Sequence, residues 1–329
     1  MTSAVARLIL DETGPLAGRV LVVDDVDGEL TSAALGAGCQ VRTWCDDVRA
    51  EASIPAAHRT PLLTGAGADI VLWRLPRALS AVDDIAQRLA DGASPNLRVV
   101  AGARVKHMTR AQNDELARHF SSVRASLGRD KSRVIHAGGP LAAEPRWPIR
   151  RFEPELGLHV VSRGTVFNTN RLDAGTRLLL NALDAHRPDP GRRALDWGSG
   201  SGIIASFLAR AGFEVTATDV SADAVESTAL TAAANDLRVT ALRLDGLTGL
   251  DAASVDLLVT NPPFHVGAAK DSTPTLDMFE QASEVLAPGG ELWAVWNSHL
   301  PYLPRLRAIG PTRLVARDRS FTVSRTIRR

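Results

Sequence analysis

The sequence has few cysteines, little net charge and no long apolar run, and each shortage excludes a class of protein. Its 329 residues include two cysteines, Cys39 and Cys45, too few for a disulfide framework or a four-cysteine metal site. Because 38 lysines and arginines nearly balance 37 acids, the formal charge is +1, and any nucleic-acid contact must come from a local basic surface. No apolar run approaches the roughly 18 residues that span a bilayer. We therefore expect a soluble cytoplasmic protein.

Length and composition indicate two globular domains. Hydrophobic residues make up 45% and charged residues 23%, which is ordinary globular usage. At about 150 residues per domain, the chain has room for two. A stretch rich in Gly, Pro and Arg over 138–155 breaks regular structure and predicts a linker. We expect one domain over 1–145 and another over 146–329.

Four strand-like segments of the first half recur, in the same order, in the second half. The paired segments are 20–28 with 194–202, 40–44 with 214–218, 68–77 with 255–264, and 97–101 with 291–295. The residue numbers of the first pair differ by 174, and the difference changes along the chain because the loops differ in length. Strands that alternate with helical patterns favour parallel sheets covered by helices on both faces. The predicted fold is α/β, with two tandem Rossmann-like, doubly wound domains. Segments 312–317 and 321–327 are expected to close the second sheet as an antiparallel hairpin.

A glycine-rich turn in the second half predicts a cofactor site. Gly198, Gly200 and Gly202 lie between a predicted strand and a predicted helix over 203–211. Glycines suit a sharp turn at positive φ and let a ligand approach the backbone. The spacing is G-x-G-x-G and not the dinucleotide pattern G-x-G-x-x-G. That spacing favours an adenosyl cofactor without a pyrophosphate.

Two aspartates follow the next two predicted strands. Asp219 ends the strand over 213–218, about twenty residues after the glycines, where an acid accepts hydrogen bonds from ribose hydroxyls. Its alternative role is to cap the following helix. Asp245 follows the strand over 239–244 and is either an acceptor for an adenine amine or a solvent-facing turn residue.

The turn Asn261-Pro262-Pro263-Phe264 is the most informative motif. It follows an apolar strand at the carboxyl end, where α/β sheets place ligands, and its prolines fix φ near −65°. The Asn261 side-chain oxygen and the Pro262 carbonyl can each accept one N–H of an exocyclic amine on an aromatic base, and Phe264 can stack on that base. Such an amine needs alignment and polarisation more than a strong base. The plainer alternative is a turn without chemistry.

These motifs resemble class I S-adenosylmethionine-dependent methyltransferases and, more narrowly, the ribosomal RNA guanine-N2 methyltransferases of the RsmC and RlmG type. The resemblance covers about 157–329 and depends on four stretches: 164–180, the glycine turn, 261–267, and 288–292 with 297–302. That family also carries an N-terminal domain that looks like a decayed copy of the catalytic one, in agreement with the repeat.

The resemblance implies an enzyme that transfers a methyl group from S-adenosylmethionine to the N2 amine of a guanine in ribosomal RNA. It implies that cofactor-binding residues are Asp196, Gly198, Ser199, Gly200, Gly202, Asp219, Asp245 and Asn261. The implied catalytic turn is Asn261, Pro262, Pro263 and Phe264, and the implied substrate contacts are Phe264, His265, Phe167, Arg171 and Asp173. Ser199 departs from the family, whose members commonly have cysteine there. The expected partner is ribosomal RNA or a ribosomal subunit, and the expected state is a monomer.

The first half is predicted to bind no cofactor. The offset aligns Asp24, Val26 and Gly28 with the three glycines, and a β-branched valine resists positive φ. Cys45 aligns with Asp219, and Arg74 aligns with Asn261, so a cation replaces the amine acceptor. This half is expected to hold RNA or to stabilise the catalytic half.

Other patterns give weaker or negative predictions. The eight histidines show no metal-ligand spacing, and the acidic run at 24–27 lacks the glutamate that a calcium loop needs at its twelfth position. Arginines near the C-terminus either bind phosphates or are solvated surface residues. Two alternatives to the guanine reaction stay open: methylation of another planar amine, such as adenine N6 or a protein glutamine amide, and a non-enzymatic RNA-binding module.

Overall fold

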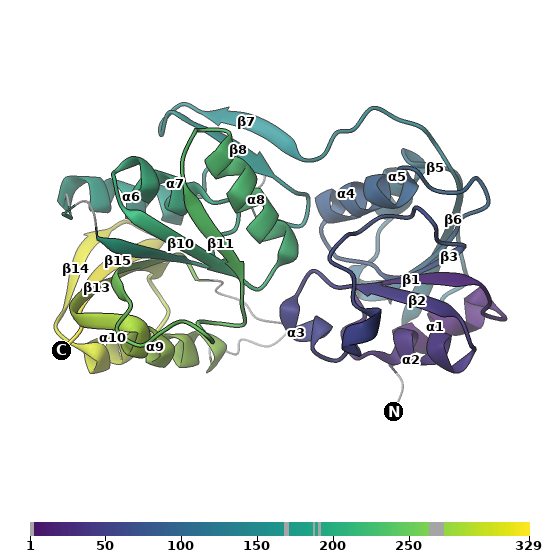
Figure 1. The fold of residues 1–329 in the computed structure, drawn as a ribbon, viewed down its shortest axis with the longest axis horizontal. Helices are drawn as coiled ribbons and strands as arrows, with labels where there is room; N and C mark the ends of the chain where they lie inside the picture. The colour runs from purple at the N-terminus through teal and green to yellow at the C-terminus, as the bar shows by residue number, and fades with distance from the viewer. Residues whose placement is uncertain (1–2, 168–170, 187, 190–191, 263–272) are drawn as a thin grey trace. The chain divides into compact units, whose positions relative to one another are not determined.

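The computed structural model describes residues 3–167, 171–186, 188–189, 192–262 and 273–329. The chain forms two compact units. Unit 1 comprises Met1–Ile149 and Arg163–Thr165, and unit 2 comprises Arg150–Ser162 and Val166–Arg329. Each unit is a sheet with helices on both faces (Figure 1).

Unit 1 contains a six-stranded sheet of order β2-β1-β3-β4-β6-β5. The first four strands are parallel, whereas β6 runs antiparallel to both β4 and β5. Its strands are β1 (Arg19–Val23), β2 (Gln40–Trp44), β3 (Ile70–Arg74), β4 (Arg98–Arg104), β5 (Phe120–Ala125) and β6 (Ser132–Pro140). Its helices are α1 (Ala4–Thr13), α2 (Glu29–Gly36), α3 (Val48–Glu51), α4 (Leu79–Ala90) and α5 (Ala111–Ala117), with 3-10 turns at Ala56–His58 and Val105–His107.

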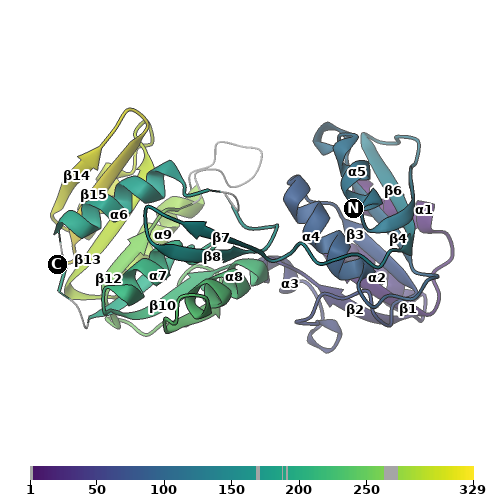
Figure 2. The ribbon, with the colours of Figure 1, turned by 90° about the horizontal axis from the view of Figure 1, so that it is seen from above.

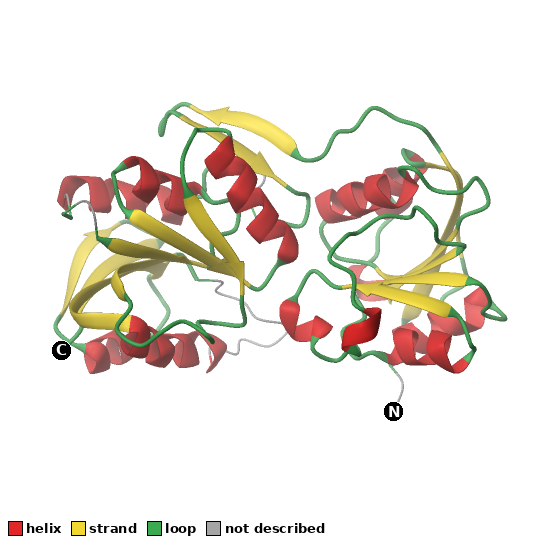
Figure 3. Cartoon of the chain, viewed as in Figure 1, coloured by secondary structure: helices red, strands yellow, loops and turns green. Residues whose placement is uncertain are grey.

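The core of unit 1 follows the alternation of side chains along its strands. Val20 and Val22 of β1 face one side, where they join Leu8 and Ile9 of α1 in one apolar cluster with Leu30 of α2. Helices α4 and α5 cover the opposite side, as Figure 3 shows. Because both faces are covered, the central strands are almost continuously apolar.

Unit 2 contains a seven-stranded sheet of order β11-β10-β9-β12-β13-β15-β14. The first five strands are parallel, and β15 runs antiparallel to β13 and β14. Its strands are β9 (Arg193–Trp197), β10 (Glu214–Asp219), β11 (Val239–Arg243), β12 (Val255–Thr260), β13 (Leu286–Asn297), β14 (Thr312–Arg317) and β15 (Phe321–Ile327). A separate two-stranded sheet is formed by β7 (Ile149–Glu153) and β8 (Leu158–Ser162).

Two layers of helices cover the sheet of unit 2. They are α6 (Ala174–His186), α7 (Ile203–Arg210), α8 (Ala222–Ala233), α9 (Thr273–Val285) and α10 (Leu303–Ile309). Leu257 and Val259 of β12 pack in the cluster that contains α6 and α7, whereas Leu258 packs in the cluster that contains α9 and α10. Figure 2 shows α6, α7 and α8 spread along one face of the sheet. Each fully buried leucine stabilises the fold by about 1.5–3 kcal/mol.

The tandem fold and the closing hairpin are confirmed. The order β2-β1-β3-β4-β6-β5 of unit 1 matches β10-β9-β12-β13-β15-β14 of unit 2 strand for strand, and unit 2 adds β11 at its edge. The antiparallel last strand expected in the second sheet is observed, whereas the expectation of a parallel sheet was wrong at one end of unit 1, where β6 runs antiparallel to β4 and β5. There the connection is too short for a helical crossover, so an antiparallel strand follows instead.

The predicted linker over 138–155 was too long. Gly138 pairs with Arg98 within the sheet, so β6 continues to Pro140, and β7 begins at Ile149. Glycine is compatible with an extended strand, and its position in the ladder outweighs its tendency to break elements. Trp147 is also anchored in unit 1, where its Nε1 donates to Asp83 at 2.9 Å.

Candidate active site

The predicted cofactor and substrate motifs begin at one edge of the unit 2 sheet. Trp197, the last residue of β9, pairs with Thr218 of β10 on one side and with Thr260 of β12 on the other. The Thr260 hydroxyl donates to the Trp197 carbonyl at 2.7 Å. The glycine turn and Asn261 therefore leave the sheet side by side at its carboxyl edge, where doubly wound folds bind ligands.

The glycine turn has the backbone that its composition predicts. Gly198, Gly200 and Gly202 have φ values of +77°, +53° and +75°, which side-chain-bearing residues rarely adopt. Gly202 is the N-cap of α7, and a Cβ there would lie 2.7 Å from the Thr228 backbone of α8. A Cβ on Gly198 would meet nothing within 4 Å, so the backbone is open at that point. The turn is closely packed at Gly202 and open at Gly198, and this combination suits a backbone that binds a ligand.

The carboxylate of Asp219 lies against this turn. Its Oδ2 accepts a hydrogen bond from the Gly200 N–H at 3.0 Å, and its Oδ1 accepts from the Ser221 N–H at 3.0 Å. The N-cap of α8 is Ser221, whose side chain accepts from Ala224, so Asp219 is not the cap. Ser199 is buried, and its hydroxyl accepts a hydrogen bond from Thr228 at 2.9 Å, which ties the turn to α8. The ribose role of Asp219 stays a prediction.

Asp196 is a fully buried carboxyl group with one unsatisfied oxygen. Its Oδ2 accepts from the Ala205 N–H at 2.9 Å, and its Oδ1 has no hydrogen-bond partner within the described ranges. Burial raises the pKa of Asp196 to about 7, and the negative charge of Asp219 adds to the shift, while the Ala205 hydrogen bond opposes it. A buried acceptor beside the glycine turn fits a positively charged ligand group.

Asn261 is oriented by two acceptors on the first turn of α6. Its Nδ2 donates to Thr176 Oγ1 at 2.9 Å and to Asp173 Oδ2 at 3.1 Å. Both amide hydrogens are used, and Asn261 Oδ1 is buried without a hydrogen-bond partner in the part of the chain that the structure describes. The amide therefore presents a bare acceptor, which is the arrangement that recognition of an N–H donor requires.

The start of α6 brings a further aromatic side chain to this place. Asp173 accepts from the Thr176 N–H at 3.0 Å and so caps the helix. A Cβ on Gly175 would lie 3.0 Å from Asp173 Oδ2 and 3.2 Å from the Phe321 ring. Gly175 thus leaves room for the Phe321 ring of β15 against the first turn of α6. Sequence reasoning missed Thr176, Gly175 and Phe321, although the Asp-x-x-Thr spacing of a helix start was a usable signal.

The other predicted site residues are not gathered by the described contacts. The side chain of Phe167 is 76% exposed, and Arg171 and Asp245 are also exposed. Pro262 is buried next to Asn261, whereas Pro263, Phe264 and His265 lie outside the described residues. Within the described ranges, no group of three or more His, Cys, Asp or Glu residues is placed to hold a metal ion. No helix among them is long and apolar enough to cross a membrane.

The equivalent edge of unit 1 is occupied by an arginine. Arg74 ends β3 just as Asn261 follows β12, and it donates to Asp27 and to Ser3 Oγ, the latter at 3.1 Å. The Arg74 guanidinium also lies 3.7 Å from the buried Asp25 and 3.4 Å from Glu29. Protein carboxylates surround the cation at the place where unit 2 presents an amide oxygen.

The turn after β1 keeps part of the glycine-turn geometry. Gly28 is the N-cap of α2 at φ +70°, as Gly202 is the N-cap of α7, and Asp24 has a positive φ of +57°, as Gly198 has at +77°. Val26 is absent from the residues with positive φ and is 59% exposed. The expected conflict between valine and positive φ is therefore resolved by a different backbone conformation at this position.

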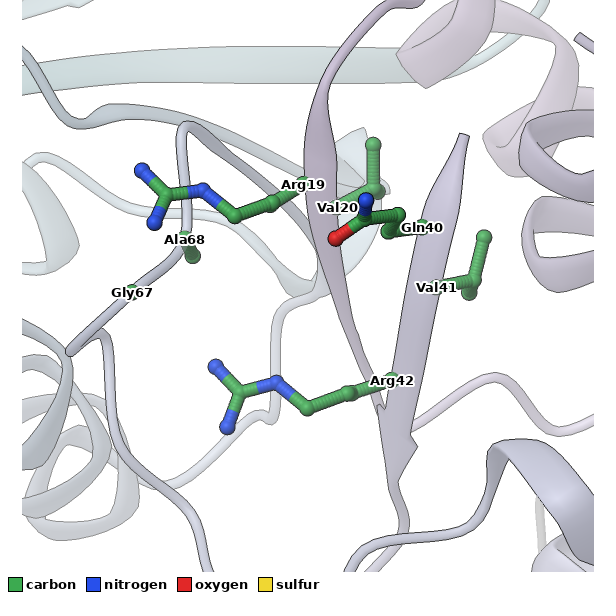
Figure 4. A pocket seen from close by; sticks show the side chains of 7 residues that line it. All are labelled: Arg19, Val20, Gln40, Val41, Arg42, Gly67 and Ala68. Atoms are coloured by element: carbon green, nitrogen blue, oxygen red, sulfur yellow. The ribbon is translucent and has the colours of Figure 1, made fainter. Parts of the chain in front are cut away.

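A pocket of about 130 Å³ in unit 1 lies at the opposite ends of these strands. Figure 4 shows Arg19 and Arg42 extending from β1 and β2 toward Gly67 and Ala68. Arg19 is bound to Asp69, with 2.7 Å between Nη2 and Oδ1, and Arg42 donates to the Ala66 carbonyl at 2.9 Å. The pocket lies at the amino ends of the strands, and both guanidinium groups already have protein partners.

Comparison with known proteins defines the class and then the family. Residues 157–325 match the family model described as methyltransferase small domain, and residues 4–140 match the RLMG N-terminal domain. The fold and the carboxyl-edge site are those of a class I S-adenosylmethionine-dependent methyltransferase, in agreement with the resemblance stated above.

A protein of Streptomyces coelicolor named ribosomal RNA large subunit methyltransferase G is 35% identical over 341 residues, which cover 95% of this chain and 89% of that protein. A protein of the same name from Ectopseudomonas mendocina is 37% identical over 262 residues, covering 78% of this chain and 70% of that protein. The chain belongs to the ribosomal RNA large subunit methyltransferase G family.

A solved structure shares the fold of the whole chain. It is the T. thermophilus 16S rRNA guanine-N2 methyltransferase RsmC in complex with AdoMet and guanosine, with a TM-score of 0.82 and 23% identity. The match covers 99% of this chain and 92% of that one. Both units therefore belong to one recurrent two-unit architecture.

Cofactor affinity is expected to increase as pH rises toward and through 7. The buried Asp196 carboxyl has a pKa raised to about 7 and is therefore largely protonated below that pH. A cationic ligand group favours the charged carboxylate, so binding of S-adenosylmethionine below pH 7 must release a proton, and affinity falls as pH falls. Calorimetry at pH 6 and pH 8, in buffers of different ionisation enthalpy, measures both effects. Asp196→Asn should bind weakly with no such pH dependence; an equally steep dependence in that variant contradicts the assignment.

Proposed function

We propose that this protein transfers a methyl group from S-adenosylmethionine to the exocyclic N2 amine of a guanine in large-subunit ribosomal RNA. The observation that carries the proposal is Asn261 Oδ1, a buried acceptor that has no partner among the described residues and whose amide is held by Asp173 and Thr176. The names of its relatives supply the class of RNA, and a guanine amine offers the N–H that this oxygen lacks.

The chain's own residues align and polarise the amine. Asn261 Oδ1 accepts one N–H, and the Pro262 carbonyl accepts the other, so that the nitrogen lone pair turns toward the methyl group. S-adenosylmethionine supplies an electrophilic methyl group on a sulfonium when bound. Asp196, Asp219 and the glycine turn would hold it at the same sheet edge. Because the amine loses its proton only after transfer, no residue has to act as a strong base.

Unit 1 binds no cofactor under this proposal and serves to hold RNA or to stabilise unit 2. The support is the Arg74 cluster, since Asp25, Asp27 and Glu29 surround a cation at the position equivalent to Asn261. Acting on ribosomal RNA, the protein would work in the cytoplasm.

Tritiated methyl transfer tests the reaction and separates it from its alternatives. Large subunits, small subunits and naked RNA from a strain that lacks the gene are incubated with the protein and labelled S-adenosylmethionine. We expect label in large-subunit RNA, recovered as N2-methylguanosine after digestion to nucleosides. Label in N6-methyladenosine or in a glutamine amide supports the other planar amines. Absence of transfer together with absence of cofactor binding supports the non-enzymatic module.

A further inference from the structure

The carboxyl edge of unit 2 continues beyond Asn261 into an open groove. The groove has a volume of about 460 Å³ and is lined by Asn297, Ser298, His299, Arg317, Arg319 and Ser320. Asn297 ends β13, and Ser298 and His299 follow it; Arg317 ends β14, and Arg319 and Ser320 belong to the turn between β14 and β15. We propose that this groove binds the phosphodiester backbone of the RNA substrate next to the target nucleotide, an inference that rests on the proposed function.

The position of the groove fits that role. In the sheet, β13 lies between β12 and β15, so these two strands are two strand spacings, about 10 Å, apart. The groove therefore lies beside Asn261, on the side away from the glycine turn that follows β9. Phe321 follows Ser320 directly, and its ring lies against Gly175 on the first turn of α6, where Asp173 is the cap. A base at Asn261 thus has its cofactor on one side and this groove on the other.

The walls of the groove are fixed by the backbone. The Ser298 N–H donates to the Ser320 carbonyl at 2.8 Å, and the hydroxyls of Ser298 and Thr322 are 2.8 Å apart. Asp318 Oδ1 accepts from the Ser320 and Phe321 N–H groups at 2.7 and 2.6 Å. The turn is therefore shaped by its own hydrogen bonds before any ligand arrives, and the Asp318 charge is partly satisfied by two backbone donors.

The two arginines of the groove have guanidinium N–H donors that form no ion pair with a described residue. Arg317 and Arg319 are exposed, and neither forms an ion pair with a described residue. By contrast, other arginines of unit 2 are paired with acids: Arg177 with Glu155, Arg193 with Asp256, Arg305 with Glu280 and Arg325 with Glu291. Guanidinium groups that flank hydroxyl and amide donors match a phosphate oxygen acceptor.

The double variant Arg317→Ala and Arg319→Ala tests the groove. We expect KM for RNA to rise about tenfold or more, while kcat at saturating RNA and cofactor affinity stay unchanged. The slope of log Kd against log salt, measured by anisotropy with a labelled ribosomal RNA fragment, should fall by about 1.4 for two lost contacts on a single strand. Lysine at both positions should restore most of the affinity.

A matched control removes two arginine charges from the amino edge of the unit 2 sheet, opposite the groove. Arg210 and Arg238 are exposed and lie near the amino ends of β10 and β11, and their double alanine variant should leave KM and the salt slope unchanged. The proposal that the groove binds RNA is contradicted if both double variants lose RNA affinity equally, or if the Kd for RNA of the groove variant is unchanged. Failure of the wild-type protein to methylate RNA overturns the proposed function instead, because anisotropy reports RNA binding without turnover.

Discussion

Replacement of Asn261 by alanine is expected to lower kcat by about 10²- to 10³-fold while cofactor affinity is retained, since it removes a preorganised acceptor at the reacting amine. The alanine side chain removes the donor to Thr176 Oγ1, whereas Asp173 Oδ2 still accepts from the Thr176 N–H. Single-turnover methyl transfer measures the rate, and calorimetry with S-adenosylmethionine measures the affinity. Wild-type turnover in this variant would refute the assigned role.

A substitution at Thr176 tests whether the orientation of the Asn261 amide matters while the amide itself is kept. Thr176→Val keeps the shape of the side chain but removes the Oγ1 that accepts from Asn261 Nδ2 at 2.9 Å. One lost hydrogen bond of about 0.5–1.5 kcal/mol corresponds to about a 2- to 12-fold loss, expected in kcat and not in cofactor affinity. Thr176→Ser retains the acceptor and should recover the rate. A structural role alone would lower thermal stability equally in both variants.

The local sequence pattern was sufficient to predict structure where the backbone preference of a single residue or a short turn determines it. Gly202 and Gly28 are both helix N-caps at positive φ, and glycine is the residue that tolerates this conformation. The hairpin of β14 and β15 was likewise predicted at its observed bounds, because its strands are separated by a short polar turn.

Contacts between distant segments were not accessible in the same way. The hydrogen bond from Asn261 to Thr176 joins residues 85 positions apart, and no periodicity in the sequence pairs them. The alignment predicted that Arg74 replaces an amine acceptor, and the acidic run at 24–27 before α2 was considered as a calcium loop and rejected. The structure unites the two observations, since Asp25 and Asp27 contact the Arg74 guanidinium. Predicting such clusters requires knowledge of which strand ends are neighbours.

Gly200→Val is expected to weaken S-adenosylmethionine binding by at least about 100-fold without unfolding the protein. At φ +53° a β-branched residue is strained, by about 1–3 kcal/mol, yet a Cβ there would meet nothing closer than Val166 at 3.8 Å. The backbone should therefore leave the positive-φ region, as it does at Val26 in unit 1, and the Gly200 N–H should lose Asp219. The cradle then changes shape, while the surrounding core is undisturbed.

The control for Gly200→Val is Gly289→Val. Gly289 has φ +76° with nothing within 4 Å of its Cβ position, and it lies near the amino end of β13, away from the cofactor edge. Both variants should lose similar thermal stability, and only Gly200→Val should lose cofactor binding in calorimetry. Since unit 1 is proposed to bind no cofactor, no second binding event should persist in Gly200→Val. Equal loss of binding in both variants would assign the effect to general strain, and wild-type affinity in Gly200→Val would place the cofactor elsewhere.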